Sequence, residues 1–292
     1  MQAAMTSTTN LAQTTLCPIC ITGQMRFAYT KNGHDILRCE SCGTGRASMR
    51  DFDPTRYYTR AYFEGGHDDG YANYGRSEAV LRKEFARLTA KLRTVAPQGG
   101  PLLEIGCAYG FFLQTARLHW RVYGLEISAE AVEHCHATGL STVRQGMANR
   151  ESLAALSAFQ AIVMLDVVEH LPDPVGLLEA CREKLLPGGV LMLTTGDFGS
   201  PLALLLGSRW RLMTPPQHLW FFTVPGFRAL AQRQGWDVVR LGHPGKRVPL
   251  SLILFQIRRM LRLAPRVPAR GAEIGIPLNL GDAMLLILRR SS

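Results

Sequence analysis

The sequence predicts an α/β protein with a doubly wound sheet, preceded by a small metal-binding module. Two stretches indicate the sheet: PLLEIGCAYGFFL over residues 101–113 and RVYGLEIS over residues 121–128, each an apolar strand with an acid near its end. Two C-x-x-C pairs near the N-terminus indicate the metal-binding module. With 292 residues, 47% of them hydrophobic, the chain is long enough to bury one full core and carry small appendages.

The first stretch enters a helix through a glycine turn. Glu104 precedes the turn, and Gly106 and Gly110 bracket it. Glycines suit a backbone that turns tightly and approaches a ligand closely, because a Cβ would block the approach, and the following helix offers N–H groups to an anion. A glycine turn alone is also common between a strand and a helix where no ligand binds. Glu126, at the end of the second strand, favours a nucleotide ligand because its carboxylate can accept hydrogen bonds from both ribose hydroxyls.

At these residues the sequence resembles the class I S-adenosylmethionine-dependent methyltransferases. The family's usual turn reads acid-x-Gly-x-Gly-x-Gly, and this chain departs from it at Ala108. An NAD-binding turn is the main rival, but it reads Gly-x-Gly-x-x-Gly and does not require the acid at Glu104. The runs EHLPDP and PGG further along extend the resemblance over roughly residues 57–290. It implies a seven-stranded Rossmann-like methyltransferase sheet that binds S-adenosylmethionine.

The resemblance also implies which residues contact the cofactor. Asp166 follows a buried strand, Met147 stands where the family often has an acid near the adenine, and Tyr71 and Tyr74 belong to a tyrosine-rich segment that would cover the cofactor. Packing between modules is an equally good explanation of that segment. The predicted cofactor contacts are Glu104, Gly106, Cys107, Ala108, Gly110, Glu126, Asp166, Tyr71, Tyr74 and Met147.

Methyl transfer needs little chemistry from the protein, because the sulfonium of the cofactor is already a good leaving group. A base is required only if the nucleophile, an O, N or C atom, must lose a proton. His170, at the end of the strand over 159–168, and His218, in the run QHLWFFT, are the catalytic candidates, since an unperturbed imidazole has a pKa near 6.5. A structural role for either histidine is an open alternative.

Cys17 and Cys20 form one C-x-x-C pair, and Cys39 and Cys42 form another, with a segment suited to a short hairpin between them. This spacing is typical of a zinc ribbon with four thiolate ligands. Four protein ligands leave no open coordination position, so the one Zn²⁺ is expected to be structural.

The predicted organisation has five parts. A flexible tail spans 1–14, the zinc ribbon 15–50, a helical and aromatic lid with its linker 51–98, and the S-adenosylmethionine-binding core 99–242. A basic extension over 243–292 contains an amphipathic helix at 250–263 and the last strand, which is expected to run antiparallel.

The formal net charge of +10 favours anionic partners. A small-molecule or glycan-type acceptor is expected, with two alternatives: an RNA methyltransferase that holds phosphates with the ribbon and basic tail, and a non-catalytic cofactor-binding protein. The run LDVVEH disfavours RNA, because it lacks the Asn/Asp-Pro-Pro-aromatic motif of enzymes that methylate exocyclic amines. The 250–263 helix is expected to dock on the domain or to lie on an anionic membrane. Without a signal peptide or a span of about 20 apolar residues, a cytoplasmic location is expected.

Overall fold

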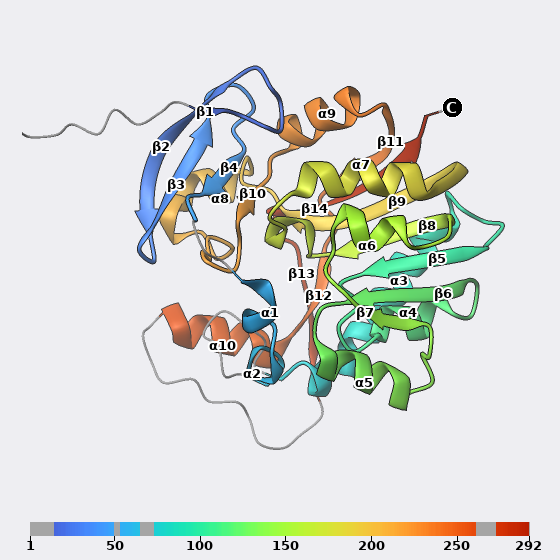
Figure 1. The fold of residues 1–292 in the computed structure, drawn as a ribbon. Coiled ribbons are helices and arrows are strands. Elements are labelled where there is room, and N and C mark those ends of the chain that lie inside the picture. Colours follow the sequence, from blue (N-terminus) through green and yellow to red (C-terminus); the bar gives the residue numbers. More distant parts are fainter. Residues whose placement is uncertain (1–14, 50–52, 65–72, 261–272, 292) are drawn as a thin grey trace, which may run out of the picture.

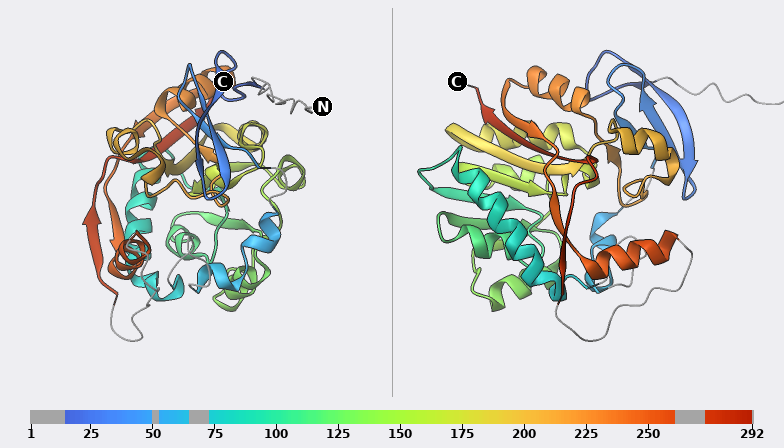
Figure 2. Two further views of the ribbon diagram at one scale, coloured as in Figure 1. Left: turned by 90° about the vertical axis from the view of Figure 1, so that its left-hand side faces the viewer. Right: turned by 180° about the vertical axis from the view of Figure 1, so that it is seen from behind.

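The body of the molecule is a seven-stranded sheet with helices on both faces, and a smaller five-stranded sheet lies at one end of it (Figure 1). The structure is a computed structural model that describes residues 15–49, 53–64, 73–260 and 273–291. The five-stranded sheet and helix α10 (Leu250–Met260) lie on the same side of the molecule, which is the side toward which the central strands point (Figures 1 and 2).

The seven-stranded sheet has the order β11-β14-β9-β8-β5-β6-β7. The strands from β5 to β9 pair with their neighbours in parallel. Strand β14 pairs antiparallel with both β9 and β11. This arrangement confirms the predicted fold class and the antiparallel last strand. The strands are β5 (Pro101–Ile105), β6 (Arg121–Glu126), β7 (Val143–Gln145), β8 (Phe159–Leu165), β9 (Leu185–Gly196), β11 (Trp236–Gly242) and β14 (Ala283–Arg290).

Successive side chains along each strand point to opposite faces of the sheet, so a hydrophobic core forms on each face. In β5, Leu102 packs on one face and Leu103 on the other, as expected for a sheet that is covered on both sides. One face is covered by α3 (Glu78–Arg93), α4 (Phe111–Ala116) and α5 (Ala129–Ala137). The other is covered by α6 (Arg150–Ala154), α7 (Pro174–Lys184) and α9 (Val224–Arg233). Helices therefore cover both faces of the sheet, as the predicted doubly wound fold requires.

The five-stranded sheet has the order β1-β2-β3-β4-β10. Its first four strands come from the predicted ribbon: β1 (Thr15–Leu16), β2 (Gln24–Lys31), β3 (His34–Cys39) and β4 (Gly45–Ala47). The fifth, β10 (Trp220–Phe221), comes from the chain that follows the central sheet and pairs antiparallel with β4. The sequence did not predict that the ribbon shares a sheet with a segment some 175 residues later.

The segment between β9 and β10 forms α8 (Pro201–Leu206) and the 3-10 turn η3 (Gly207–Arg209). It is anchored by Asp282, which is 1% exposed just before β14. The Asp282 carboxylate accepts hydrogen bonds from Trp210 Nε1 at 2.9 Å and from Arg211 Nε and Nη2 at 3.0 and 2.9 Å. A buried charge requires such pairing, because an unpaired one would be strongly destabilising.

The C-terminal part adds a two-stranded antiparallel ribbon of β12 (Lys246–Pro249) and β13 (Gly275–Leu278) beside α3. Between these strands lies α10, which confirms a helix over 250–260; the remainder of the predicted 250–263 range lies outside the described residues. Within the described ranges, no helix has both the length and the apolar character that a membrane span requires.

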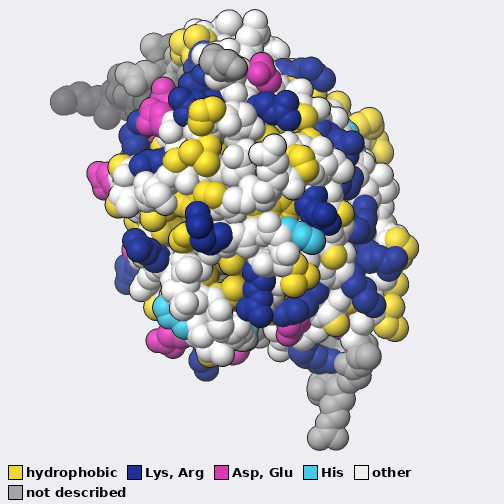
Figure 3. Space-filling model, turned by 90° about the vertical axis from the view of Figure 1, so that its right-hand side faces the viewer, with side chains coloured by type: hydrophobic (Ala, Val, Ile, Leu, Met, Phe, Trp, Pro, Cys, Tyr) yellow, Lys and Arg dark blue, Asp and Glu magenta, His cyan; other side chains and the backbone are white. Residues whose placement is uncertain are grey.

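The remaining short elements lie near the ends of the parallel strands. They are α1 (Pro54–Tyr57), α2 (Arg60–Phe63), η1 (Gly75–Ser77) and η2 (Val168–His170). At the opposite end of the sheet, Lys and Arg side chains are far more frequent than Asp and Glu (Figure 3). The positive charge of the chain is therefore not confined to its C-terminal extension.

We predict that Asp282→Asn destabilises the fold by about 3 kcal/mol, because it removes the charge that compensates the partly buried Arg211. Chemical denaturation measures the free energy of unfolding. The control is Glu40→Gln, which breaks the exposed Arg26–Glu40 pair and is expected to cost at most about 1 kcal/mol. Equal effects of the two substitutions would show that the Asp282 network does not anchor the segment.

Candidate functional site

The glycine turn between β5 and α4 has the backbone conformation that the sequence led us to expect. Gly106, Ala108 and Gly110 have φ values of 72°, 47° and 75°. A Cβ on Gly106 would come within 2.6 Å of Val167 Cγ2, so the close approach of the two strand ends requires glycine there. Ala108 adopts the left-handed conformation at the position where the resembled family has its middle glycine, so the turn keeps its shape despite the substitution.

Glu126 ties the ends of β5 and β6 together. Its Oε2 accepts a hydrogen bond from the Ala108 N–H at 2.8 Å, and its Oε1 accepts one from the Ser128 N–H at 2.9 Å. The side chain is 5% exposed, and this burial raises the pKa of Glu126, although the backbone N–H groups of Ser128 and Ala108 oppose the rise. The carboxylate thus sits at the rim of the turn with fixed orientation.

Three of the predicted cofactor contacts lie beneath the turn. Glu104 is 3% exposed, and burial raises its pKa well above the usual value. Among the described residues its Oε2 has no hydrogen-bond partner. The Cys107 side chain packs in the core between the sheet and α4, and a Cβ on Gly110 would contact Leu140. The Glu104 and Cys107 side chains and the close packing at Gly110 therefore shape the turn from below.

A pocket opens where the parallel strands end. It brings together Gly106, Ala108, Glu126, Met147, Asp166, Tyr74 and His170 of the predicted set; the other predicted residue of the tyrosine-rich segment, Tyr71, lies outside the described residues. The rest of the wall is formed by Pro54, Tyr58, Tyr62, Phe63, Leu125, Ile127, Gly146, Ala148, Leu165, Val167, Leu171 and Pro172.

Aromatic side chains from the segment before β5 cover one side of this pocket. Phe63 stacks on Tyr109 with ring centroids 5.0 Å apart, and Tyr74 stacks on Phe111 at 5.2 Å. Tyr62 is 8% exposed, and its hydroxyl accepts a hydrogen bond from Gln217 Nε2 at 2.8 Å. These contacts hold the aromatic segment against both the glycine turn and the chain before β10.

Asp166 follows β8 and lies at the opposite side of the pocket from Glu126. Both of its carboxylate oxygens accept hydrogen bonds from Lys246 Nζ, at 3.0 and 2.9 Å, and Oδ1 also accepts one from the Thr194 hydroxyl at 2.8 Å. The Asp166 side chain is 47% exposed; partial desolvation would raise its pKa, but the Lys246 charge and these hydrogen bonds outweigh this effect and lower the pKa. Asp166 is therefore an ionised, paired carboxylate and a weak base.

The two predicted histidines lie together, with their ring centroids 4.7 Å apart. His170 lines the pocket, and its Nδ1 lies 2.8 Å from the Gln217 carbonyl oxygen. His218 is buried behind it, with Nδ1 2.8 Å from the Leu212 carbonyl oxygen. Burial and the neighbouring His170 hold the pKa of His218 well below its usual value, so this ring is neutral.

Sequence reasoning missed a third member of this cluster. Glu169 is 4% exposed, and burial together with the nearby Asp166 charge raises its pKa to about 8. Its position directly before His170 was a usable signal, since the two residues together follow the end of a buried strand. Lys246 and Gln217 gave no such signal, because their partners lie 80 and 155 residues away in the chain.

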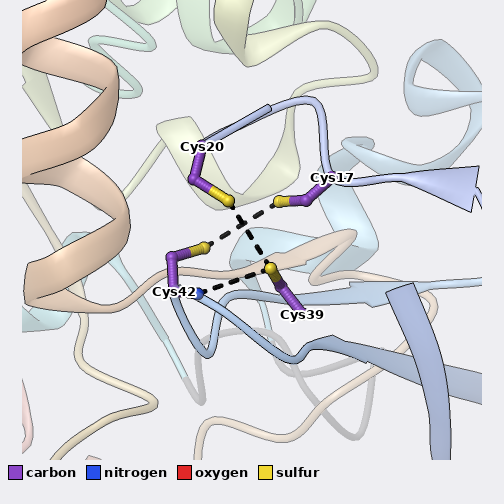
Figure 4. Close-up of side chains that lie close together, drawn as sticks. All are labelled: Cys17, Cys20, Cys39 and Cys42. Atoms are coloured by element: carbon purple, nitrogen blue, oxygen red, sulfur yellow. Dashed lines mark hydrogen bonds between the residues drawn. The ribbon is translucent and has the colours of Figure 1, made fainter. Parts of the chain in front are cut away.

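The four cysteines of the ribbon converge from its two knuckles (Figure 4). Cys17 Sγ and Cys42 Sγ lie 3.9 Å apart, and Cys20 Sγ and Cys39 Sγ lie 3.6 Å apart. Four thiolates at about 2.3 Å from one zinc ion in a tetrahedron would be about 3.8 Å apart, so the arrangement fits zinc. The contact between Cys17 and Cys42 lowers the pKa of Cys42 to about 5 and raises the pKa of Cys17, because the two sulfurs share one proton.

Comparison with known proteins agrees with this geometry. Residues 77–241, more than half of the chain, match the family model described as a methyltransferase domain. A ubiquinone biosynthesis O-methyltransferase from Cereibacter sphaeroides is 31% identical over 153 residues, which are 49% of this chain and 62% of that protein. The chain thus spans less than two thirds of the length of the curated relatives it matches.

Two solved structures share the fold at low sequence identity. The magnesium protoporphyrin IX methyltransferase from Synechocystis PCC 6803, solved with bound SAH, has a TM-score of 0.52 and 16% identity, and the match covers 82% of this chain and all of that one. The YcgJ protein from Bacillus subtilis has a TM-score of 0.50 and 16% identity, covering 70% of this chain and 98% of that one.

Proposed function

Since the chain belongs to the methyltransferase-domain family, we propose that it transfers a methyl group from S-adenosylmethionine to a hydroxyl oxygen of a small-molecule acceptor. The observation that carries the proposal is the pocket at the strand ends, which has Glu126 and the glycine turn on one side and His170 on the other. Donor and acceptor must meet at close range for methyl transfer, and both groups of residues line this one pocket.

The cofactor fits the Glu126 side of the pocket. A carboxylate offers about four lone-pair positions, of which the Ala108 and Ser128 N–H groups take two, so two remain for ribose hydroxyls. Met147, which is 38% exposed at the pocket, would contact the adenine through its apolar side chain. When bound, the cofactor supplies an activated methyl group, and the residues of this chain orient it and exclude water.

The acceptor would then lie toward His170, under the aromatic wall. The Tyr58 ring packs edge-to-face on the His170 ring, with centroids 5.9 Å apart. An aromatic ring of the acceptor could pack beside them in the same way. His170 is the group placed to act on the acceptor's proton, and His218 would position it. The name of the Cereibacter sphaeroides relative supports O-methylation over N- or C-methylation. A glycan-type acceptor is the alternative within the small-molecule class.

A screen for methyl acceptance tests the function directly. Purified protein is incubated with methyl-labelled S-adenosylmethionine and separate pools of hydroxylated aromatic metabolites, glycan precursors and RNA. Label is expected in the first pool. Transfer of the label to RNA alone would show that the protein is an RNA methyltransferase. Binding of the cofactor without transfer to any pool would favour a non-catalytic binding protein.

We predict that Glu126→Ala weakens S-adenosylmethionine binding by roughly 30-fold to 1000-fold, or about 2 to 4 kcal/mol, because two charge-assisted hydrogen bonds are lost and water replaces them only in part. Glu126→Gln should fall between, since it keeps one acceptor. Calorimetric titration measures the affinities, with the exposed Glu133→Ala as control. Unchanged affinity in Glu126→Ala would show that the ribose does not lie at Glu126. Tight binding of NAD in place of S-adenosylmethionine would show that the cofactor assignment is wrong.

We also predict one zinc ion bound by Cys17, Cys20, Cys39 and Cys42. Metal analysis of protein purified without chelators should find close to one equivalent, and Cys39→Ser should lose it together with thermal stability, because the buried sulfurs belong to the same core cluster as the central sheet. The control is Cys181→Ala, a buried cysteine on α7 that should retain the metal. If the wild-type protein contained no metal, the assignment of a zinc site to these four cysteines would be wrong.

A further inference from the structure

Glu169, His170 and His218 form a cluster on the acceptor side of the pocket. One carboxylate oxygen and one ring nitrogen from each histidine all lie within 4.8 Å of one another. The three residues come from two segments, η2 and the chain before β10. A backbone hydrogen bond from the Leu219 N–H to the Glu169 carbonyl oxygen, at 2.9 Å, joins these segments.

The hydrogen bonds of the two rings fix where their protons lie. A carbonyl oxygen can only accept, so His170 Nδ1 donates to Gln217 and His218 Nδ1 donates to Leu212. In a neutral ring the lone pair is then on Nε2. Histidines that bind metals commonly show this arrangement, in which a backbone carbonyl holds the Nδ1–H and directs Nε2 toward the ion.

The third group is a buried carboxyl group that lacks one partner. Glu169 is 4% exposed, and among the described residues its Oε2 has no hydrogen-bond partner. Buried polar atoms in native proteins are nearly always paired, and an exception calls for an explanation such as a bound ion.

We propose that Glu169, His170 and His218 bind a divalent transition-metal ion. Two imidazole nitrogens and one carboxylate suit zinc, iron, cobalt or manganese better than calcium or magnesium, which prefer oxygen ligands. Bonds of about 2.1 Å place adjacent ligand atoms about 3 Å apart, so the cluster must contract slightly around the ion. Three protein ligands leave positions open for an acceptor.

This inference rests on the proposed function, because it assigns the ion to the acceptor. His170 lies on the pocket wall, so an open coordination position beside it faces the space where the acceptor hydroxyl would lie. A hydroxyl oxygen bound to a metal has a lowered pKa. Its proton would leave to solvent water, and the metal-bound oxygen would be held as an anion beside the methyl donor. The two histidines would then act as ligands and not as bases.

The test is a titration of the full-length protein with Co²⁺, after its ribbon metal has been quantified. Cobalt bound by nitrogen and oxygen gives weak visible bands, whereas thiolate-bound cobalt gives intense sulfur-to-metal bands, so the spectrum distinguishes the two sites. One equivalent of the first kind is expected. His218→Gln and Glu169→Gln should each weaken its binding by about 100-fold. The control His243→Gln, whose ring pairs with Asp197 outside the cluster, should bind as the wild type.

Three results would overturn the proposal: absence of a nitrogen- and oxygen-type cobalt spectrum in the wild type, equal binding by His218→Gln and His243→Gln, or full methyl transfer after complete removal of non-ribbon metal. The fold of each variant is checked by its affinity for S-adenosylmethionine, which depends on the other side of the pocket. Failure of the proposed function has a different signature, namely cobalt binding that persists while S-adenosylmethionine does not bind.

Discussion

The pairing of β10 with β4 is the constraint on which the acceptor side of the molecule depends. On one side, Trp220 pairs with Arg46, and the Ala47 N–H donates to the Leu219 carbonyl oxygen at 2.9 Å. On the other, the Trp220 indole donates to the Leu171 carbonyl oxygen at 3.0 Å. The short strand is therefore held between the ribbon and the end of β8. Because His218 lies two residues before β10, the ribbon fixes a residue of the candidate site although no ribbon side chain lines the described pocket.

The proposed cofactor side of the pocket is held by other contacts. The turn after β5 is held by Glu126 from β6 and by the packing of Gly106 against Val167, all within the central sheet. These contacts join neighbouring parallel strands, whose carboxyl ends necessarily meet at one edge. Disruption of the ribbon should thus affect the acceptor side more than the cofactor side. The tyrosine-rich segment connects the two, since Phe63 contacts the turn through Tyr109 and Tyr62 contacts Gln217.

Local patterns allowed much of this to be predicted. Strand and helix periodicity predicted the central sheet. The glycine turn around Gly106 and the acid at Glu126, on which the proposed cofactor site rests, could also be predicted, because they depend on residues close in sequence. The pairing of β10 with the ribbon could not be read from a two-residue strand. The Asp166–Lys246 pair and the Glu169 cluster depend on contacts between distant segments, which single-sequence periodicity does not encode. Roles of individual site residues stay predictions until they are tested.

The charges around the pocket favour a cationic cofactor on one side only. Glu126 is buried, and within the described residues its carboxylate accepts hydrogen bonds from backbone N–H groups and forms no ion pair with a Lys or Arg. The charge of Asp166, in contrast, is offset by Lys246 at 2.9 Å. A sulfonium ion would gain from the unbalanced carboxylate, while the Asp166 side would neither attract nor repel an acceptor strongly. Since Lys246 belongs to β12, the C-terminal extension contributes directly to this asymmetry.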